Sequence, residues 1–540
     1  MNPAASTIAV VSEGTGGTGA PIGAIEAVLL LFVAATALAI AARRIGLPYP
    51  ILLVLGGLVI GFLPGLPHIE LEPDLVFLLF LPPILFGAGY FTSIRDFKAN
   101  LRPIALLSVG LVLATTVAVA VVVQALVPGL GWAPAFALGA IVAPPDAIAA
   151  TSIFQRLGVP RRVVTILEGE SLVNDATALV AYRFAIGAAL GAGFSLVDAS
   201  VAFLFVASGG VLFGLVVGVV VAWIFRRVDD PVFAVVVSFL APPAAYIPAE
   251  HLGLSGVLAT VAAGIYTGRH ASRTLSSSGR VAGAAAWQVL LFLINGAVFI
   301  LIGVQLPTVL EGLGDRSVGE LVGLAAAVAV TVIVVRILWV FPGTYMPRWL
   351  SAGIRAREAR PSERNVFIVA WAGMRGVVSL AAALALPLDF PERHLLVFLS
   401  FSVILATLVG QGLTLPLIIR RLGIVADRGD AQEEASARAA AAEAAVRRIA
   451  ELEREWPGHL ELIEALRVQY GHRSRDSELH GGELADEAER ELLEHRIIRS
   501  AVIDAERAAL EVLRDAGAIR DEIFRRVERD LDLEELRMET

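Results

Sequence analysis

The chain has 540 residues, of which 56% are hydrophobic and 17% charged, and its mean hydropathy is +0.74. A soluble globular protein has about 45–50% apolar and about 25% charged residues, so this composition excludes an ordinary soluble chain. The net charge of −8 is unevenly divided: residues 1–420 carry 24 Lys and Arg against 21 Asp and Glu, and residues 421–540 carry 19 against 30. The lack of cysteine excludes disulfides and thiolate chemistry. The sequence predicts a polytopic membrane protein with an acidic soluble tail.

The first two regions of the chain are a leader and a membrane domain. Residues 1–21 are rich in Gly, Ser and Thr and carry no Lys or Arg, so we expect a short leader outside the membrane rather than a secretory signal. Residues 22–420 contain thirteen stretches that are long and apolar enough to cross a bilayer as helices. These stretches are 22–42, 48–66, 75–91, 103–128, 133–155, 163–189, 197–225, 231–249, 252–268, 281–306, 319–343, 365–388 and 394–419.

The third region, 421–540, is rich in Ala, Glu, Arg and Leu. Opposite charges recur there at helical spacing, which predicts solvated helices such as 432–456 and 484–516, with a break around 471–482. We interpret the tail as surface helices that pair with each other or with a second subunit. A ligand-sensing role is the alternative.

The loops between the stretches indicate the orientation of the chain. Lys and Arg accumulate in loops on the cytoplasmic side. The odd-numbered loops carry eighteen Lys and Arg, whereas the even-numbered loops carry only Arg316 and Arg393. A helix that was overlooked or counted in error would disrupt this alternation of basic and non-basic loops. The sequence therefore predicts thirteen helices, an N-terminus outside the cell and a cytoplasmic tail.

Six charged side chains fall inside the predicted spans, where each costs about 2.5–3.5 kcal/mol at the bilayer centre. They are Asp146, Glu168, Glu170, Asp175, Arg336 and Arg375. Asp146 follows two prolines, which lack N–H groups and disfavour helix before them, so the fifth stretch should break in mid-span. Freed carbonyl oxygens beside a carboxylate form a candidate site for a hard monovalent cation. A proline kink with an incidentally paired Asp is the alternative.

The sixth stretch carries a polar stripe on an otherwise apolar helix. Ser171, Asn174 and Asp175 share one face by three- and four-residue spacing. A structural polar network between helices would produce such a stripe. A carboxylate that binds a proton and a cation in turn explains it better, so we predict an ion-binding role for Asp175.

The twelfth stretch is also expected to be interrupted. Gly373 and Gly376 flank the buried Arg375 and weaken the helix there. The fifth and twelfth stretches thus carry opposite charges at their breaks. They occupy corresponding places if stretches 1–6 and 8–13 form inverted repeats, an arrangement that places a transport site at such breaks.

Four motifs, in order and spacing, resemble the cation:proton antiporter-1 family, the sodium/proton exchangers. They are FLPPILFGAGY at 80–90, PPDA at 144–147, LEGESLVND at 167–175 and GMRGVVS at 373–379. The resemblance covers about residues 80–420. It implies an all-α fold of thirteen helices, a homodimer, and a core domain that moves against a dimerisation domain in elevator-like alternating access.

The resemblance also implies the residues of the ion site. Asp175 matches the family's ion-binding carboxylate, and Asn174 matches the residue before it. Asp146 matches the Asp of the crossing helices, and Ser171 matches a Ser ligand. An Asn-Asp pair is similar to the electroneutral branch of the family, which exchanges one cation for one proton.

Three further residues match positions with a structural role. Glu170 and Arg336 match a structural ion pair of the family. Arg375 matches the arginine that balances the charges of the half-helices.

The chain departs from the family pattern at three positions. Gly87 stands where many relatives have an acidic residue, and Pro145 and Ala147 stand where many have Thr and Pro around the crossing-helix Asp. These departures leave the expected mechanism intact but affect the choice of cation.

We hypothesise that Asp175 takes either a dehydrated monovalent cation or a proton, never both, which couples the two fluxes. Asp146, Ser171 and the carbonyl of Pro145 are expected to complete the shell of the transported cation, while Asn174 holds the geometry. Sodium is the expected cation, with potassium and lithium as alternatives. No cofactor is expected.

Other functional classes fit less well. A channel would need a filter-like repeat, which the sequence lacks. A proton-coupled carrier of another small solute, or a membrane sensor that signals through the tail, remains as an alternative. No constellation of catalytic Ser, His and Asp residues appears, so we predict that the chain is not an enzyme. Basic residues never cluster beside aromatics, which argues against a nucleic-acid partner.

Overall fold

A computed structural model of the chain describes residues 20–63, 76–191, 196–314, 316–357, 360–424, 428–479 and 501–539, apart from 514, 517, 519 and 520. The described residues form helices joined by turns, with no strand among them, which confirms the predicted all-α class. Two compact units meet in sequence at Ala426. Residues 1–19, most of the predicted leader, lie outside the described part of the chain.

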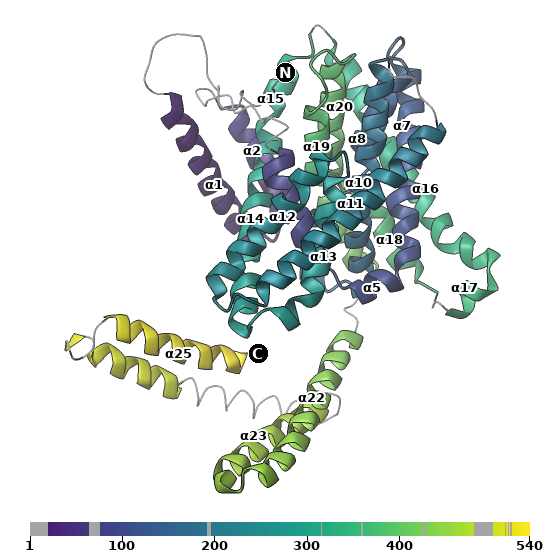
Figure 1. The fold of residues 1–540 in the computed structure, drawn as a ribbon. Helices are drawn as coiled ribbons and strands as arrows, with labels where there is room; N and C mark the ends of the chain where they lie inside the picture. Colours follow the sequence, from purple (N-terminus) through teal and green to yellow (C-terminus); the bar gives the residue numbers. More distant parts are fainter. Residues whose placement is uncertain are drawn as a thin grey trace. The chain divides into compact units, whose positions relative to one another are not determined.

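The described part of the first unit contains α-helices, which Figure 1 labels, and three short π-helical segments, named η1 to η3. Its first half comprises α1 (Ala20–Ile45), α2 (Tyr49–Gly61), η1 (Val76–Phe80), α4 (Leu81–Phe91), α5 (Ile94–Ala99), α6 (Leu101–Ala105), η2 (Leu106–Leu111), α7 (Val112–Leu126), α8 (Trp132–Val142), α9 (Ala147–Leu157) and α10 (Arg161–Ala189). Its second half comprises α11 (Leu196–Phe225), α12 (Pro231–His251), α13 (Gly256–Thr274), α14 (Ser277–Val304), α15 (Leu306–Glu311), α16 (Val318–Leu350), α17 (Ala352–Arg357), α18 (Glu363–Trp371), α19 (Val377–Leu384), α20 (Arg393–Leu405), η3 (Ala406–Gln411) and α21 (Gly412–Arg421).

Each of the thirteen predicted stretches overlaps one of these helices or a consecutive set of them. Seven stretches within the described residues are long and apolar enough to cross a membrane, from Leu101–Leu126 to Arg393–Arg421. Shorter apolar helices include Tyr49–Gly61 and Leu78–Phe91. The chain is therefore a multi-pass membrane protein, and the count of thirteen crossings stays a prediction.

Two of the predicted helices are interrupted in the middle, as expected from their prolines and glycines. The fifth stretch ends as α8 at Val142 and resumes as α9 at Ala147, with Pro144 and Pro145 in the gap. The twelfth stretch ends as α18 at Trp371 and resumes as α19 at Val377. Four helix ends thus lie inside the membrane unit, and each exposes backbone groups that need partners.

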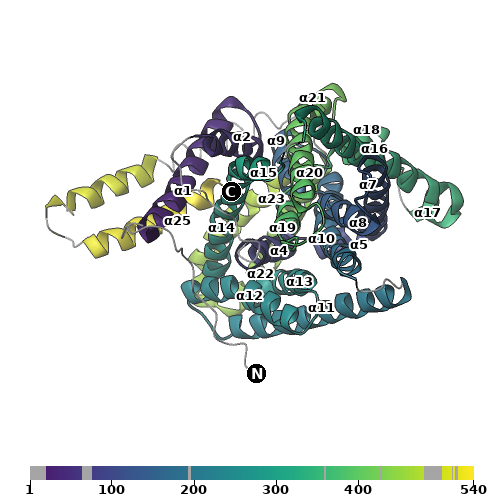
Figure 2. The ribbon, with the colours of Figure 1, turned by 90° about the horizontal axis from the view of Figure 1, so that it is seen from above.

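The helices of the membrane unit pack as two groups. In one group α11 and α4 pack on α13, and α14 packs on α2 and α12. In the other group α8 packs on α7 and α10, and α16 packs on α7, α18 and α20. Figure 2 shows α11, α12, α13 and α4 on one side of the unit and α7, α8, α16 and α20 on the other. The interrupted helices belong to the second group.

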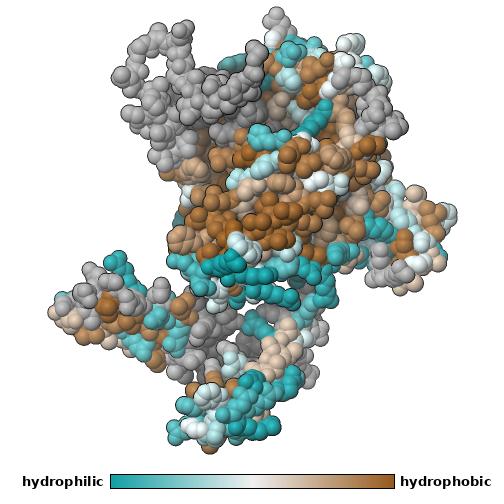
Figure 3. Space-filling model, viewed as in Figure 1, coloured by the Kyte–Doolittle hydropathy of each residue, from teal (hydrophilic) through white to brown (hydrophobic). Residues whose placement is uncertain are grey.

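The outer surface of the membrane unit is strongly apolar. On the face seen in Figure 3, hydrophobic residues form a broad band above a hydrophilic lower edge. Helix α11 contributes many exposed apolar side chains to the surface, among them Leu204, Phe205, Leu212, Val216 and Trp223. Such a surface is unstable in water and suits contact with lipid or with another apolar face.

The second unit consists of paired helices. Helix α22 (Arg428–Glu455) packs against α23 (Leu460–Leu479), and residues 501–513 form a helix whose Arg507 pairs with Glu535 of α25 (Asp521–Glu539) at 2.6 Å. The predicted break around 471–482 is wrong for its described part, because α23 continues through Gly471 to Leu479. A helical glycine costs only about 1 kcal/mol, which packing against α22 offsets, and the chain turns instead at Pro457.

Close backbone packing joins α14 to α2. Gly303 lies so near the backbone of Val54 and Leu58 that a Cβ atom in its place would overlap both. Gly283, on the same helix, has no atom within 4 Å of the position that a Cβ would take. The two glycines therefore differ in what they do: Gly303 permits the contact between helices, and Gly283 does not take part in one.

We predict that Gly303→Ala lowers the stability of the purified protein by about 1–3 kcal/mol, because α2 and α14 must move apart to admit the methyl group. The measurement is the midpoint of thermal unfolding in detergent. Gly283→Ala is the matched control and should be neutral or slightly stabilising, since alanine favours helix. Equal midpoints for the two variants would contradict the close contact.

Candidate functional site

The two interrupted helices meet at their breaks. The backbone N–H of Asp146, in the gap between α8 and α9, donates to the carbonyl of Met374, in the gap between α18 and α19, at 2.7 Å. Met374 is fully buried. The unwound segments are thus held together by a backbone hydrogen bond, and the two helices cross as predicted.

Arg375 satisfies the carbonyl end of α8. Its Nε–H donates to the carbonyl of Val142 at 3.0 Å and an Nη2–H to that of Ala143 at 3.4 Å, while Nη1 donates to Gly373. The side chain is fully buried. A cation at a helix C-terminus opposes the negative end of the helix dipole, so Arg375 compensates the interruption of α8.

Asp146 lies at the N-terminal end of a helix, α9, whereas Arg375 contacts a C-terminal end. Its Oδ1 accepts from the N–H of Ile148 at 2.8 Å, which makes it the N-cap of α9, and the N–H of Val377 at the start of α19 lies near the carboxylate. A Cβ atom at Gly376 would overlap this carboxylate. Glycine at 376 therefore allows one anion to serve the N-termini of two half-helices.

A cavity of about 280 Å³ lies beside this crossing, between the two helix groups. Asp146, Ser171, Asp175 and the Pro145 segment line it, together with residues of α4, α14 and α19. The N–H of Ala147 donates to Oγ of Ser171 at 3.4 Å. The structure therefore brings four of the five predicted ion-site residues to one cavity.

Asn174, the fifth, does not line the cavity. Its Nδ2 donates to the carbonyl of Pro145 at 2.9 Å, and it is fully buried. Asn174 thus fixes the unwound segment against α10. This geometry suits a positioning role better than direct contact with an ion.

Asp175 differs from Asp146 in its surroundings. It is 7% exposed, yet among the described residues none donates a hydrogen bond to its carboxylate. A buried carboxylate without donors is costly when it is ionised, unless a cation or a proton joins it. Asp175 is therefore the side chain of the cavity that is best suited to bind one of the two.

Glu170 and Arg336 form a fully buried, two-point ion pair. The Nη1–Oε1 distance is 2.5 Å and the Nη2–Oε2 distance is 2.8 Å. Arg336 also donates to the carbonyl of Val369, near the C-terminal end of α18, from Nε at 3.2 Å and from Nη2 at 3.0 Å. Arg336 thus satisfies a carbonyl near the C-terminal end of α18, just as Arg375 satisfies the carbonyls at the end of α8.

Five polar residues of the cavity wall have no role that the sequence predicts: Thr92, Thr151, Glu168, Asn295 and Ser379. Oδ1 of Asn295 and Oγ of Ser379 are buried and have no hydrogen-bond partner among the described residues. An amide in the middle of apolar α14 was the signal that could have identified Asn295.

The structure shows which residues surround Gly87 and Arg183. Gly87 lines the cavity, and a Cβ there would meet the terminal methyl of Leu291 at 2.8 Å. Arg183, for which no role was predicted, pairs with Glu250 of α12 at 2.6 Å near the surface. The Arg183–Glu250 pair links the two helix groups away from the cavity.

Several known proteins resemble this chain in sequence or in fold. Residues 28–421 match the family described as "Sodium/hydrogen exchanger, transmembrane". An uncharacterised Na⁺/H⁺ exchanger of Mycobacterium tuberculosis is 34% identical over 94% of this chain and 96% of its own length. A sodium, potassium, lithium and rubidium/H⁺ antiporter of Bacillus pumilus is 34% identical over 69% of this chain and 58% of its own. The solved sodium proton antiporter of Methanocaldococcus jannaschii has the same fold, with a TM-score of 0.59 and 21% identity over 74% of this chain and 99% of that one.

We predict that Glu170→Gln destabilises the protein by about 3–5 kcal/mol, because it leaves the buried charge of Arg336 uncompensated. Thermal unfolding in detergent measures the loss. The matched control is Asp96→Asn, which breaks the pair with Arg161 at the start of α10. Those side chains are 32% and 60% exposed, so the control should lose at most about 1 kcal/mol. Similar losses for both variants would contradict the structural role of the buried pair.

Proposed function

The chain belongs to the sodium/hydrogen exchanger family of membrane cation/proton antiporters, and we propose that it exchanges one monovalent cation for one proton. Sodium is the first candidate, with potassium and lithium as alternatives. One relative at 34% identity is described as an uncharacterised Na⁺/H⁺ exchanger, and another as a sodium, potassium, lithium and rubidium/H⁺ antiporter. The family therefore supports the class of reaction, and a transport assay decides which cation is exchanged.

One observation carries the proposal: Asp175 lies in a cavity with Asp146 and Ser171 but without a hydrogen-bond donor among the described residues. A cation and a proton would therefore compete for the same carboxylate. Only a charge-compensated site can cross a low-dielectric barrier at moderate cost, so this competition couples the fluxes.

The neighbouring residues are assigned supporting roles. Asp146, Ser171 and the carbonyls near Pro145 would complete the oxygen shell of the cation, in keeping with the preference of hard cations for oxygen. Asn174 would hold the Pro145 segment in place. Arg375 and the Glu170–Arg336 pair would keep the broken helices at fixed positions while ions come and go.

The arrangement of helices supports alternating access by an elevator-like movement. The cavity lies between the two helix groups, with α4 and α14 on one wall and α10 and α19 on the other. Sliding of the second group against the first would carry Asp175 from one side of the membrane to the other. We further propose a homodimer in the cell membrane, with the N-terminus outside and the acidic 421–540 tail in the cytoplasm.

The lining of the cavity favours a cation over a larger solute. Its acidic side chains, Asp146, Glu168 and Asp175, supply carboxylate oxygens, which are the ligands that hard cations prefer. A carrier of another small solute is thus the weaker alternative. A sensor that signals through the tail is tested by deletion of 421–540, because full transport after deletion would count against it.

We predict that Asp175→Asn abolishes exchange, because asparagine can neither release a proton nor supply a charge to the cation. Purified protein in liposomes with an imposed pH gradient provides the assay: internal pH is followed on addition of sodium, potassium or lithium, with the membrane potential clamped at zero. Wild type should collapse the gradient with at least one cation.

Asp229→Asn serves as the control for this prediction, since Asp229 is an exposed residue of the loop between α11 and α12. It should retain wild-type exchange. Transport by a well-folded Asp175→Asn protein would refute the assignment of the site.

We also predict that the steady-state pH gradient is independent of the membrane potential, because a one-for-one exchange of monovalent ions moves no net charge. Each charge that crosses 100 mV carries about 2.3 kcal/mol, enough to shift an electrogenic exchange equilibrium by about fiftyfold. The same liposomes, held at 0 and at −100 mV by an ionophore, provide the measurement. A steady-state pH gradient that follows the voltage would instead indicate unequal stoichiometry.

A further inference from the structure

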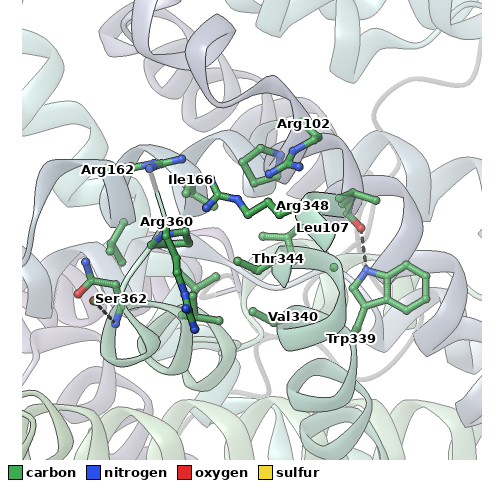
Figure 4. A pocket seen from close by; sticks show the side chains of 18 residues that line it. Arg102, Leu107, Arg162, Ile166, Trp339, Val340, Thr344, Arg348, Arg360 and Ser362 are labelled. Atoms are coloured by element: carbon green, nitrogen blue, oxygen red, sulfur yellow. Dashed lines mark hydrogen bonds between the residues drawn. The ribbon is translucent and has the colours of Figure 1, made fainter. Parts of the chain in front are cut away.

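A second cavity, of about 240 Å³, lies in the membrane unit and shares no residue with the ion cavity. It is enclosed by the α6–η2 segment, the start of α10, the end of α16, and the segment that leads into α18 (Figure 4). Four separate stretches of chain therefore converge on it. Neither the ion site nor the exchange mechanism uses it.

Four arginines line this cavity, one from each of those stretches: Arg102, Arg162, Arg348 and Arg360. No Asp or Glu is among the described residues that line it. Figure 4 shows Arg102, Arg162 and Arg348 on three helices and Arg360 on the segment that leads into α18. Arg348 is only 7% exposed and lies in the last turn of α16. Arg360 also forms an ion pair with Glu363 of α18 at 3.4 Å, so part of the positive charge is compensated. Nε and Nη1 of Arg102 and Nε of Arg348 are nevertheless buried N–H groups with no acceptor among the described residues, so donors remain for an anion.

Neutral hydrogen-bonding groups add to the cationic side of the cavity. Thr344, Ser362 and Asn365 line it beside the arginines. Arg162 is oriented by its Nε–H, which donates to Oδ1 of Asn100 at 3.0 Å. A guanidinium carries five N–H donors in a planar fork, so one arginine can contact a neighbour and an anion at the same time.

The remaining wall is apolar. Leu107, Ile166, Val340 and Val366 line it, and Trp339 closes it with its Nε1–H donated to the carbonyl of Leu106 at 3.0 Å. A free inorganic anion would gain nothing from this wall. A phosphate group that carries glycerol and acyl chains would fill both parts of the cavity.

We propose that this cavity binds the phosphate group of an anionic phospholipid. Guanidinium groups match phosphate oxygens in two-point hydrogen bonds, and basic pockets between transmembrane helices are suited to lipid head groups. All four arginines belong to the odd-numbered loops, which the proposed orientation places in the cytoplasm, where the leaflet is rich in anionic lipid. The lipid would brace α10 against α16, the two helices that carry Glu170 and Arg336.

The test uses the purified full-length protein in detergent and follows both the thermal-unfolding midpoint and the lipid that stays bound in mass spectrometry. The probes are diphosphatidylglycerol, phosphatidylglycerol, zwitterionic phosphatidylcholine, glycerol 3-phosphate and inorganic phosphate. The variants are Arg348→Gln, the double variant Arg102→Gln/Arg348→Gln, and Arg360→Gln, whose largely exposed side chain can be replaced without disturbing the fold. Arg44→Gln, at an exposed arginine of another odd-numbered loop, is the matched control.

The expected result is that the anionic phospholipids raise the midpoint of wild type and of Arg44→Gln, with little effect of phosphatidylcholine. Arg360→Gln and Arg348→Gln should each weaken apparent lipid affinity about tenfold or more, and the double variant should weaken it further. If glycerol 3-phosphate or inorganic phosphate displaces the lipid at a comparable concentration, the cavity is still a phosphate site, but its ligand is a soluble phosphate rather than a lipid. Equal lipid binding by wild type, Arg360→Gln and the double variant, or no binding by wild type, would overturn the proposal.

Discussion

The interruption of two helices inside a membrane is the constraint on which the rest of this structure depends. Each break leaves backbone groups without their helical partners in a place where water cannot satisfy them, at a cost of several kcal/mol per group. The chain offsets this cost with charges opposite in sign to the partial charge of each helix end. Arg375 and Arg336 contact the carbonyl ends of α8 and α18, and Asp146 accepts from the N–H end of α9 and lies near that of α19. The buried charges, which look anomalous in a membrane chain, are therefore what makes the breaks stable.

This division of roles separates the carboxylates of the membrane unit. Glu170 is committed to Arg336, and Asp146 is committed in part to backbone N–H groups. Asp175 has no such partner among the described residues, although it lies only five residues from Glu170 on α10. One helix thus presents a carboxylate that is paired with Arg336 and a carboxylate that we propose exchanges a cation for a proton. In this proposal the fixed pair maintains the geometry of the helix while the occupant of the Asp175 site changes.

Much of this could be predicted from the sequence, because the decisive signals are local. Pro144 and Pro145 cannot continue a helix, Gly373 and Gly376 weaken one, and a charge within an apolar stretch stands out. What could not be predicted depends on tertiary packing. The side chains of Asn295 and Ser379 reach the ion cavity only because α14 and α19 meet there, and the second cavity joins arginines up to 258 residues apart in sequence, from Arg102 to Arg360. The mistaken break at Gly471 has the same origin, since packing of α23 on α22 outweighs a modest local preference.

The two glycines of the ion cavity impose different limits on how the protein can diversify. At Gly376 any side chain would collide with the carboxylate of Asp146, so mutations at that codon disrupt the site itself. At Gly87 the nearest atom is the end of the flexible Leu291 side chain, which can rotate away. A single nucleotide change converts a glycine codon to one for aspartate or glutamate. A carboxylate in the wall of the cavity is therefore one mutation away at position 87, and it could be introduced without altering the crossing of the broken helices.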